Sequence, residues 1–223
     1  MTHKPRLVLL GKQGAGKGTQ AERLASHYGI THLSTGEMFR AQAAEGTAFG
    51  LEAKRYMDAG DLVPDDIVIG IIDECSVPGG PLGDGFVLDG FPRTLTQAGE
   101  LDRVLADAPL DVVINIEVPR EIVIDRIASR RVCENCQRVY HLNMRPAVNW
   151  TCDTCGGNVR QRDDDTEEAV ERRLALYEKE TVPIIEHYRA QGLLETVDGV
   201  GEGDEVFERI VNVVDKYVDR PRL

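Results

Sequence analysis

The sequence predicts an α/β protein in which helices cover both faces of a parallel five-stranded sheet. Short apolar runs alternate along the chain with amphipathic stretches that suit helices. A glycine-rich loop also joins the first apolar run directly to a helix-like stretch over Lys17–Tyr28. The expected strands are Arg6–Leu10, Ile30–Leu33, Phe86–Leu88, Val112–Val118 and Leu193–Val197.

The composition is that of a soluble globular protein. The chain has 223 residues, 42% of them hydrophobic, and no apolar run reaches the roughly 18 residues of a membrane span. The net charge of -12 argues against a nucleic-acid partner, because phosphate backbones attract basic surfaces. The N-terminal residues run into the first expected strand without the pattern of a signal peptide. We therefore expect a cytoplasmic protein that binds neither membranes nor nucleic acids.

Residues 11–19 read G-K-Q-G-A-G-K-G-T, which has the form of a phosphate-binding loop with Gly18 inserted before Thr19. Glycines allow backbone N–H groups to turn toward an anion, and the N-terminus of the following helix attracts the same charge. Lys17 adds a full positive charge, and Thr19 offers a hydroxyl to a phosphate or a metal ion. A glycine turn without a ligand is the alternative, but the order strand, loop, helix favours a nucleoside triphosphate site.

A small helical insertion follows the second expected strand, at about residues 34–63. Ser34 and Glu37 have the spacing of a capping box, which predicts a helix from there to about Glu45. A second helix is expected over Phe49–Ala59, ending at Gly60.

A second insertion, from Arg130 to Asp165, lacks helical periodicity and carries four cysteines and the only tryptophan. Two Cys-x-x-Cys pairs, separated by 15 residues, match the spacing of a closed tetrahedral zinc site. We expect a small β-rich module in which the metal replaces an adequate core. A redox pair and bound iron are the alternatives. The proposed ligands are Cys133, Cys136, Cys152 and Cys155, whereas the fifth cysteine, Cys75, has the spacing of a buried helix position.

Three features are expected beyond this module. Asp165, with Glu168 three residues later, predicts the start of a helix. Pro183 is expected to kink or break that helix. The last helix is expected over about Glu202–Val218.

The run Gly85–Arg93 places polar side chains at the end of an expected strand. Ligands of parallel sheets sit at the carboxyl ends of the strands, so Asp89 is suited to hold the water shell of Mg²⁺ and Arg93 to bind a phosphate. A surface ion pair in an ordinary turn is the alternative.

Several other arginines are placed near the two insertions. Arg126 and Arg130 are four residues apart, which predicts one face of a helix. Arg162, Arg173 and Arg40 lie near the insertion boundaries. Any one of them is more often a solvated surface residue. As a set they suit phosphoryl transfer, in which the protein mainly positions the groups and neutralises negative charge.

Taken in order, these motifs resemble those of the adenylate kinases with a long lid. The resemblance covers nearly the whole chain and rests on Gly14–Thr19, Ser34–Gly36, Asp89–Arg93 with Gln97, Val139–His141 and Arg162–Asp165. It implies a P-loop kinase core of residues 1–33, 64–128 and 166–223, an AMP-binding insertion over 34–63 and a lid over 129–165.

The resemblance also implies Mg²⁺-dependent transfer from ATP to AMP, giving two ADP, and a structural zinc ion in the lid. The catalytic residues would be Lys17, Arg93, Arg126, Arg130, Arg162 and Arg173. The ATP-binding residues would be Gly14, Ala15, Gly16, Lys17, Gly18, Thr19, Arg130, Val139, Tyr140 and Gly201. The AMP-binding residues would be Thr35, Arg40, Asp61, Leu62, Val63, Gly90, Phe91, Pro92, Arg93, Gln97, Arg162 and Arg173.

One residue departs from the family's pattern. Gln13 stands where the family usually has proline, and because proline fixes φ, we expect the loop here to be more mobile.

Gln97 favours AMP as the acceptor, since its amide can pair with an adenine edge. The first alternative is a monophosphate kinase that uses GTP as donor or another nucleotide as acceptor. The second is a nucleotide-dependent regulatory or nucleic-acid-binding protein whose zinc ribbon contacts a partner. We expect a monomer, because closure of two flaps needs free surfaces.

Overall fold

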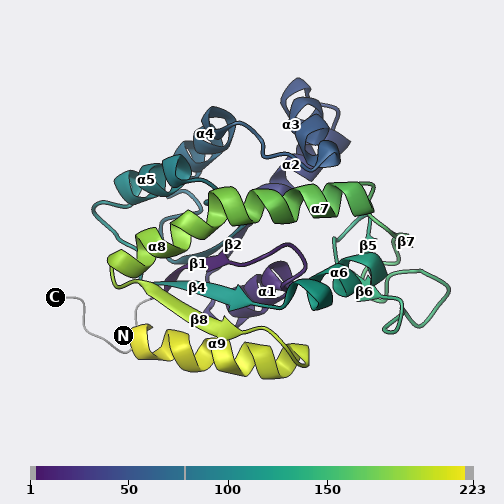
Figure 1. Ribbon diagram of the computed structural model, residues 1–223. Helices are drawn as coiled ribbons and strands as arrows, with labels where there is room; N and C mark the ends of the chain where they lie inside the picture. The colour runs from purple at the N-terminus through teal and green to yellow at the C-terminus, as the bar shows by residue number, and fades with distance from the viewer. Residues whose placement is uncertain (1–3, 78, 219–223) are drawn as a thin grey trace.

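The computed structural model describes residues 4–77 and 79–218, and its centre is a five-stranded parallel sheet (Figure 1). The strand order is β2-β3-β1-β4-β8, which confirms the predicted sheet. The observed bounds differ from the expected ones by no more than a residue at either end. They are β1 Arg6–Leu10, β2 Thr31–Ser34, β3 Phe86–Asp89, β4 Val112–Glu117 and β8 Leu194–Asp198.

The strand register brings the carboxyl ends of the strands to one edge of the sheet. Ser34 of β2 and Leu9 of β1 both pair with Asp89 of β3, and Leu10 pairs with Asn115 of β4. The glycine loop after β1, the turn after β3 and the start of the helical insertion therefore meet at this edge. This is where a parallel sheet binds its ligands.

The helical insertion contains α2 (Thr35–Ala44) and α3 (Ala48–Ala59). The Ser34 hydroxyl accepts a hydrogen bond from the backbone N–H of Glu37 at 3.4 Å, so the predicted cap is confirmed. Gly60 ends α3 in the left-handed conformation at φ 78°, as the sequence predicted.

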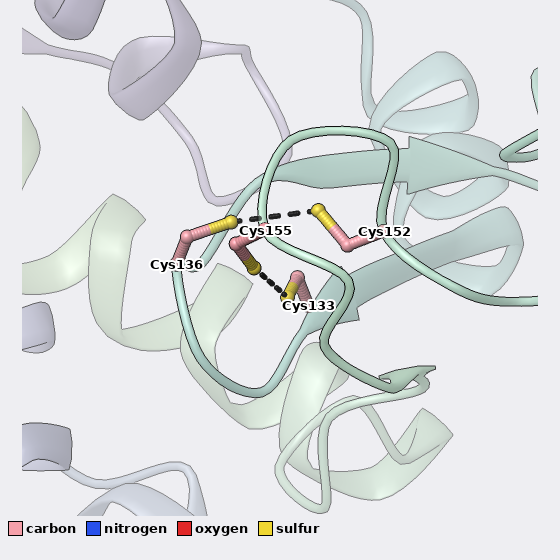
Figure 2. Close-up of side chains that lie close together, drawn as sticks. All are labelled: Cys133, Cys136, Cys152 and Cys155. Atoms are coloured by element: carbon pink, nitrogen blue, oxygen red, sulfur yellow. Dashed lines mark hydrogen bonds between the residues drawn. The ribbon is translucent and has the colours of Figure 1, made fainter.

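The second insertion forms a three-stranded antiparallel sheet in the order β6-β5-β7, which confirms the β-rich module. Its strands are β5 (Arg130–Cys133), β6 (Val139–His141) and β7 (Val159–Arg160). Cys133 ends β5, and Cys136, Cys152 and Cys155 lie in the loops outside the strands; the four side chains point toward one another (Figure 2).

The prediction that Arg126 and Arg130 share a helix face is wrong. The helix α6 (Arg120–Ser129) ends one residue before Arg130. Arg130 is extended, at φ -65° and ψ 137°, because it pairs with His141 as the first residue of β5. Tertiary strand pairing, rather than helical spacing, places its side chain.

The helix after the β-rich module is capped by Thr166, not by Asp165 as predicted. Thr166 begins α7 (Glu167–Leu176) by accepting from the N–H of Ala169 at 3.2 Å. Asp165 is unavailable as a cap because its carboxylate accepts two bonds from Arg130.

The disruption predicted at Pro183 takes the form of a π-helical turn. The turn η1 (Tyr177–Thr181) joins α7 to α8 (Val182–Ala190) without ending the helix. Pro183 lies in the first turn of α8, where the missing N–H matters least.

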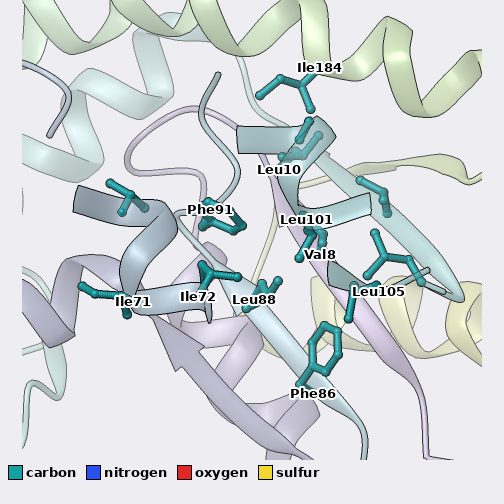
Figure 3. Packing of buried hydrophobic residues seen from close by; sticks show 14 of the residues in the cluster. Val8, Leu10, Ile71, Ile72, Phe86, Leu88, Phe91, Leu101, Leu105 and Ile184 are labelled. Carbon is teal, nitrogen blue, oxygen red and sulfur yellow. The ribbon is translucent and has the colours of Figure 1, made fainter. Parts of the chain in front are cut away.

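Two apolar clusters hold helices against the faces of the sheet. Figure 3 shows the first, in which Val8 and Leu88 pack with residues of α4 (Asp65–Cys75), α5 (Leu95–Val104) and α8. Leu7 and Leu9 point to the opposite face, where they meet α1 (Lys17–Tyr28) and α9 (Gly203–Val218). Cys75 lies in the first cluster, which confirms its expected role as a small buried side chain. None of the helices in the described part of the chain is long and apolar enough to cross a membrane.

Candidate active site

A large cleft of about 1160 Å³ opens at the carboxyl edge of the sheet, between the two insertions. The core, the helical insertion and the β-rich module all contribute to its walls. Nearly all residues proposed for nucleotide binding line it. These are Gly14, Ala15, Gly16, Lys17, Gly18, Thr19, Thr35, Arg40, Asp61, Leu62, Val63, Asp89, Gly90, Pro92, Arg93, Gln97, Arg126, Arg130, Val139, Arg162, Arg173 and Gly201.

The glycine loop has the backbone shape that an anion site requires. Gly14 and Gly16 have φ values of 81° and 96°, a region that side chains disfavour. The ammonium of Lys17 donates to the carbonyls of Gly11 at 2.8 Å and Lys12 at 3.0 Å, which holds it across the loop. Burial lowers the pKa of Lys17 to about 8, against the opposing charge of Asp89.

Asp89 lies beside the start of α1, and Gly18 makes this approach possible. A Cβ atom at Gly18 would sit 3.3 Å from the Oδ2 atom of Asp89. The inserted glycine therefore leaves room for a carboxylate next to Lys17 and Thr19. Carboxylate and hydroxyl oxygens are ligands that suit Mg²⁺ or its water shell, so the residues present fit that ion.

The arginines of the cleft repel one another and lack enough anionic partners. The Nε atoms of Arg40 and Arg162 are buried and have no partner among residues 4–77 and 79–218. Burial, together with the like charges of Arg40 and Arg130, lowers the pKa of Arg162 to about 9. Burial also lowers the pKa of Arg93, with Arg173 contributing. A polyanionic ligand would satisfy both the free donors and the excess charge.

Carboxylates at the end of the β-rich module orient two of these arginines. Arg130 binds Asp165, whose side chain is 0% exposed. Arg173 donates to the Asp164 carboxylate at 2.7 Å and to the carbonyl of Met57 in α3 at 2.5 Å. Burial disfavours the charged form of Asp164, but Arg173, Arg40 and Arg162 outweigh it and hold the pKa of this carboxyl below its usual range.

The loop after β8 is held by two arginines. Arg126 donates to the carbonyl of Gly199 at 3.1 Å. Arg209 donates to the carbonyls of Asp198 at 2.9 Å and Val200 at 2.6 Å. Gly201 follows at φ 118°, so its backbone can line the cleft without a side chain.

The amide of Gln97 is already engaged within the protein. Its oxygen accepts from the N–H of Arg93 at 2.8 Å, and its nitrogen donates to Asp65 at 2.7 Å. These bonds fix the turn that carries Arg93, whose Nε donates to the carbonyl of Gly90 at 2.8 Å.

The four cysteines form a compact sulfur cluster. Their Sγ atoms all lie within 4.8 Å of one another, and a tetrahedral zinc ion with bonds of about 2.3 Å needs sulfurs about 3.8 Å apart. The Tyr140 hydroxyl donates to the Sγ atom of Cys152 at 3.4 Å. Gly157 packs on the cluster, where a Cβ atom would lie 2.9 Å from the Sγ atom of Cys133. The donor set and its surroundings therefore fit a closed metal site.

Comparison with known proteins identifies the family. A family model described as adenylate kinase matches residues 9–193 of the chain. The chain belongs to the adenylate kinase family. The adenylate kinase of Carboxydothermus hydrogenoformans is 50% identical over 215 residues, covering 95% of this chain and 100% of the relative. Those of Thermodesulfovibrio yellowstonii and Methanosarcina barkeri are 45% and 49% identical, each covering 95% of this chain and 99% of the relative.

Two residues carried over from the adenylate kinase pattern do not line the cleft. Phe91 is 1% exposed and packs in the apolar cluster beside α4 and α5. Tyr140 points into the β-rich module, where its hydroxyl also accepts from the N–H of Asp153 at 2.9 Å. Both side chains therefore support the site from behind rather than facing it.

Three residues shape the cleft in ways that the sequence does not predict. The sequence predicts Asp165 only as a helix cap, and it gives no role to Asp65 or Arg209. Arg209 reaches carbonyls nine and eleven residues earlier, a relation without a sequence signature. The Asp65 carboxylate accepts a hydrogen bond from the side-chain amide of Gln97, 32 residues later in the chain.

Proposed function

We infer that this chain is an ATP:AMP phosphotransferase that reversibly converts ATP and AMP into two ADP in the presence of Mg²⁺. One observation carries the inference: cations from the core and from both insertions converge on one cleft at the carboxyl edge of the sheet. Membership of the adenylate kinase family supports the choice of nucleotides. The contributing cations are Lys17, Arg40, Arg93, Arg126, Arg130, Arg162 and Arg173.

The phosphate loop is proposed to hold ATP. Backbone N–H groups from Gly14 to Thr19 would surround its phosphates, with Lys17 supplying a full charge. Arg130 would approach from the lid side, and the backbone at Val139 and Gly201 would border the adenine. Tyr140 would contribute only its backbone, since its side-chain hydroxyl is hydrogen-bonded to Cys152 in the cysteine cluster.

The helical insertion and the turn after β3 are proposed to hold AMP. The insertion contributes Thr35, Arg40 and Asp61–Val63, and the turn contributes Gly90, Pro92, Arg93 and Gln97. Arg162 and Arg173 would neutralise the phosphate between the two nucleotides. Asp89 would hold Mg²⁺ through water, and the bound ion would supply positive charge to offset the negative charge of the ATP phosphates.

The chemistry asks little of the protein beyond position and charge. A phosphate oxygen of AMP forms a bond to the terminal phosphorus of ATP while the bond to the departing ADP oxygen breaks. The attacking oxygen carries no proton at neutral pH, so no general base is needed. Closure of the two insertions, residues 34–63 and 129–165, would exclude water as a competing acceptor.

The lid is proposed to be folded by a structural zinc ion. Its apolar core comprises only Cys133, Tyr140, Cys152 and Val159, with Trp150 packed against it. So small a core needs the metal for stability. We further propose a cytoplasmic monomer without membrane or nucleic-acid partners, in keeping with the charge of -12.

Turnover of defined nucleotides tests this function. The purified protein is incubated with ATP, Mg²⁺ and each of AMP, GMP, CMP and UMP, and with GTP as an alternative donor. We expect ADP formation to be fastest with ATP and AMP and to require Mg²⁺. Faster turnover with another monophosphate would show that this monophosphate, and not AMP, is the acceptor. Tight ATP binding without any phosphoryl transfer would refute the proposed enzyme activity. Elemental analysis of the same sample should find about one zinc per chain.

A further inference from the structure

The side chain of Gln13 reaches from the phosphate loop to the far end of the lid segment. Its Nε2 atom donates to the Oδ1 atom of Asp165 at 3.4 Å, across 152 residues of sequence. Gln13 also lines the cleft. The loop that is proposed to bind ATP is therefore bonded directly to the point where the chain leaves the lid.

Asp165 is the place where the lid and the core meet. Its carboxylate accepts from the Nε atom of Arg130 at 2.9 Å and also from the Nη2 atom of that residue. Its own backbone N–H donates to the carbonyl of Arg162 at 3.2 Å, and its carbonyl accepts from Gln161 at 3.1 Å. One buried carboxylate thus joins the entry of the lid, its exit and, through Gln13, the phosphate loop.

Only a donor at position 13 can complete this junction. A carboxylate oxygen accepts two hydrogen bonds, so Oδ1 accommodates both Gln13 and Arg130. Turning the amide over would place its oxygen against the carboxylate, which fixes the orientation. The Oε1 atom is meanwhile buried with no partner in the described part of the chain. An unpartnered buried acceptor costs free energy, so a side chain that merely filled space would do better without it.

We propose that Gln13 is a positioning residue that ties the phosphate loop to the lid hinge through Asp165, and so keeps Arg130 directed at the cleft before ATP binds. Its effect on ATP rests on the proposed function, whereas the tie itself does not. A proline or an aliphatic residue at this position leaves the hinge carboxylate bonded to the lid but free of the loop.

Hydrogen exchange of the nucleotide-free, metal-loaded protein tests the tie. Gln13→Met keeps the length of the side chain and removes the donor. Gln13→Glu keeps the shape and places a second carboxylate against Asp165. We expect amides in residues 161–166 to exchange about three- to tenfold faster in Gln13→Met, and at least as fast in Gln13→Glu. The matched control is Lys12→Met, since the Lys12 ammonium lies over the Tyr177 ring instead.

Kinetics then separate positioning from a structural role. We expect Gln13→Met to raise the KM for ATP while the KM for AMP and the melting temperature stay unchanged. Unchanged exchange at 161–166 overturns the proposal, and so does a general loss of protection accompanied by a lower melting temperature. Faster exchange confined to the hinge, in a protein that transfers no phosphate from ATP to AMP, supports the tie and refutes the proposed function instead.

Discussion

Replacing Lys17 by methionine removes one charge from the phosphate loop and keeps most of the aliphatic stem. In the structure the ammonium is held by two loop carbonyls, at 2.8 and 3.0 Å, and it points into the cleft beside Asp89. The substitution therefore takes away a positioned cation and leaves the loop backbone in place.

The size of the loss follows from the position of this charge. Two unit charges about 4 Å apart at an effective dielectric constant of about 20 interact by about 4 kcal/mol. If this interaction strengthens fully in the transition state, its removal lowers kcat by about 10³-fold. The loss of folding stability should be much smaller, because a buried ammonium is costly to desolvate in the folded protein.

Steady-state assays with saturating ATP, AMP and Mg²⁺ measure kcat for Lys17→Met and for a matched surface variant. Lys54→Met serves as the control, because Lys54 is 43% exposed and pairs with Asp58 on the outside of α3. We expect parental kcat in the control and parental melting in both. A loss in Lys17→Met of less than about tenfold would refute the charge-based reasoning.

Three further predictions address the metal, the magnesium site and pH. Cys133→Ser should abolish stoichiometric zinc binding and lower the melting temperature of the lid, whereas Cys75→Ser, outside the cluster, should leave the metal content unchanged. Elemental analysis and calorimetry measure both effects. Loss of catalysis in Cys133→Ser with an unchanged melting temperature would contradict a structural role for the metal. Gly18→Ala should press on Asp89 and raise the Mg²⁺ concentration for half-maximal activity by about tenfold or more, measured by titration against the parent. Because the Lys17 ammonium is the active form and burial lowers its pKa to about 8, kcat/KM for ATP should fall as pH rises above 8, and a profile flat to pH 10 would be inconsistent with that role.

The parts of the fold that the sequence predicted are those set by local patterns. The glycine loop, the five strands and the cap at Ser34 each depend on residues a few positions apart. The grouping of the four cysteines could be predicted equally well, since the spacing of the ligands reflects the geometry of a single ion.

The errors arose where a distant partner decided the outcome. Asp165 matched a helix cap, but the stronger partner was Arg130, 35 residues earlier in the chain. Arg130 matched a helix position, but pairing with His141 drew it into a strand. Tyr140 belongs to a nucleotide-contacting motif in sequence, yet its side chain supports Cys152. Local spacing could not decide among these, because each depended on which segments meet in three dimensions.

The position of β1 in the sheet affects the order of events during synthesis. Leu7 pairs on one side with Val87 and on the other with Val112, so the first strand of this sheet to be synthesised has no neighbouring strand until β3 and β4 emerge. At about 5–20 residues per second this delay lasts on the order of 5–20 s. Throughout that interval the apolar β1 edge is open to wrong pairing, and the nascent chain is most exposed to aggregation before its nucleotide site exists.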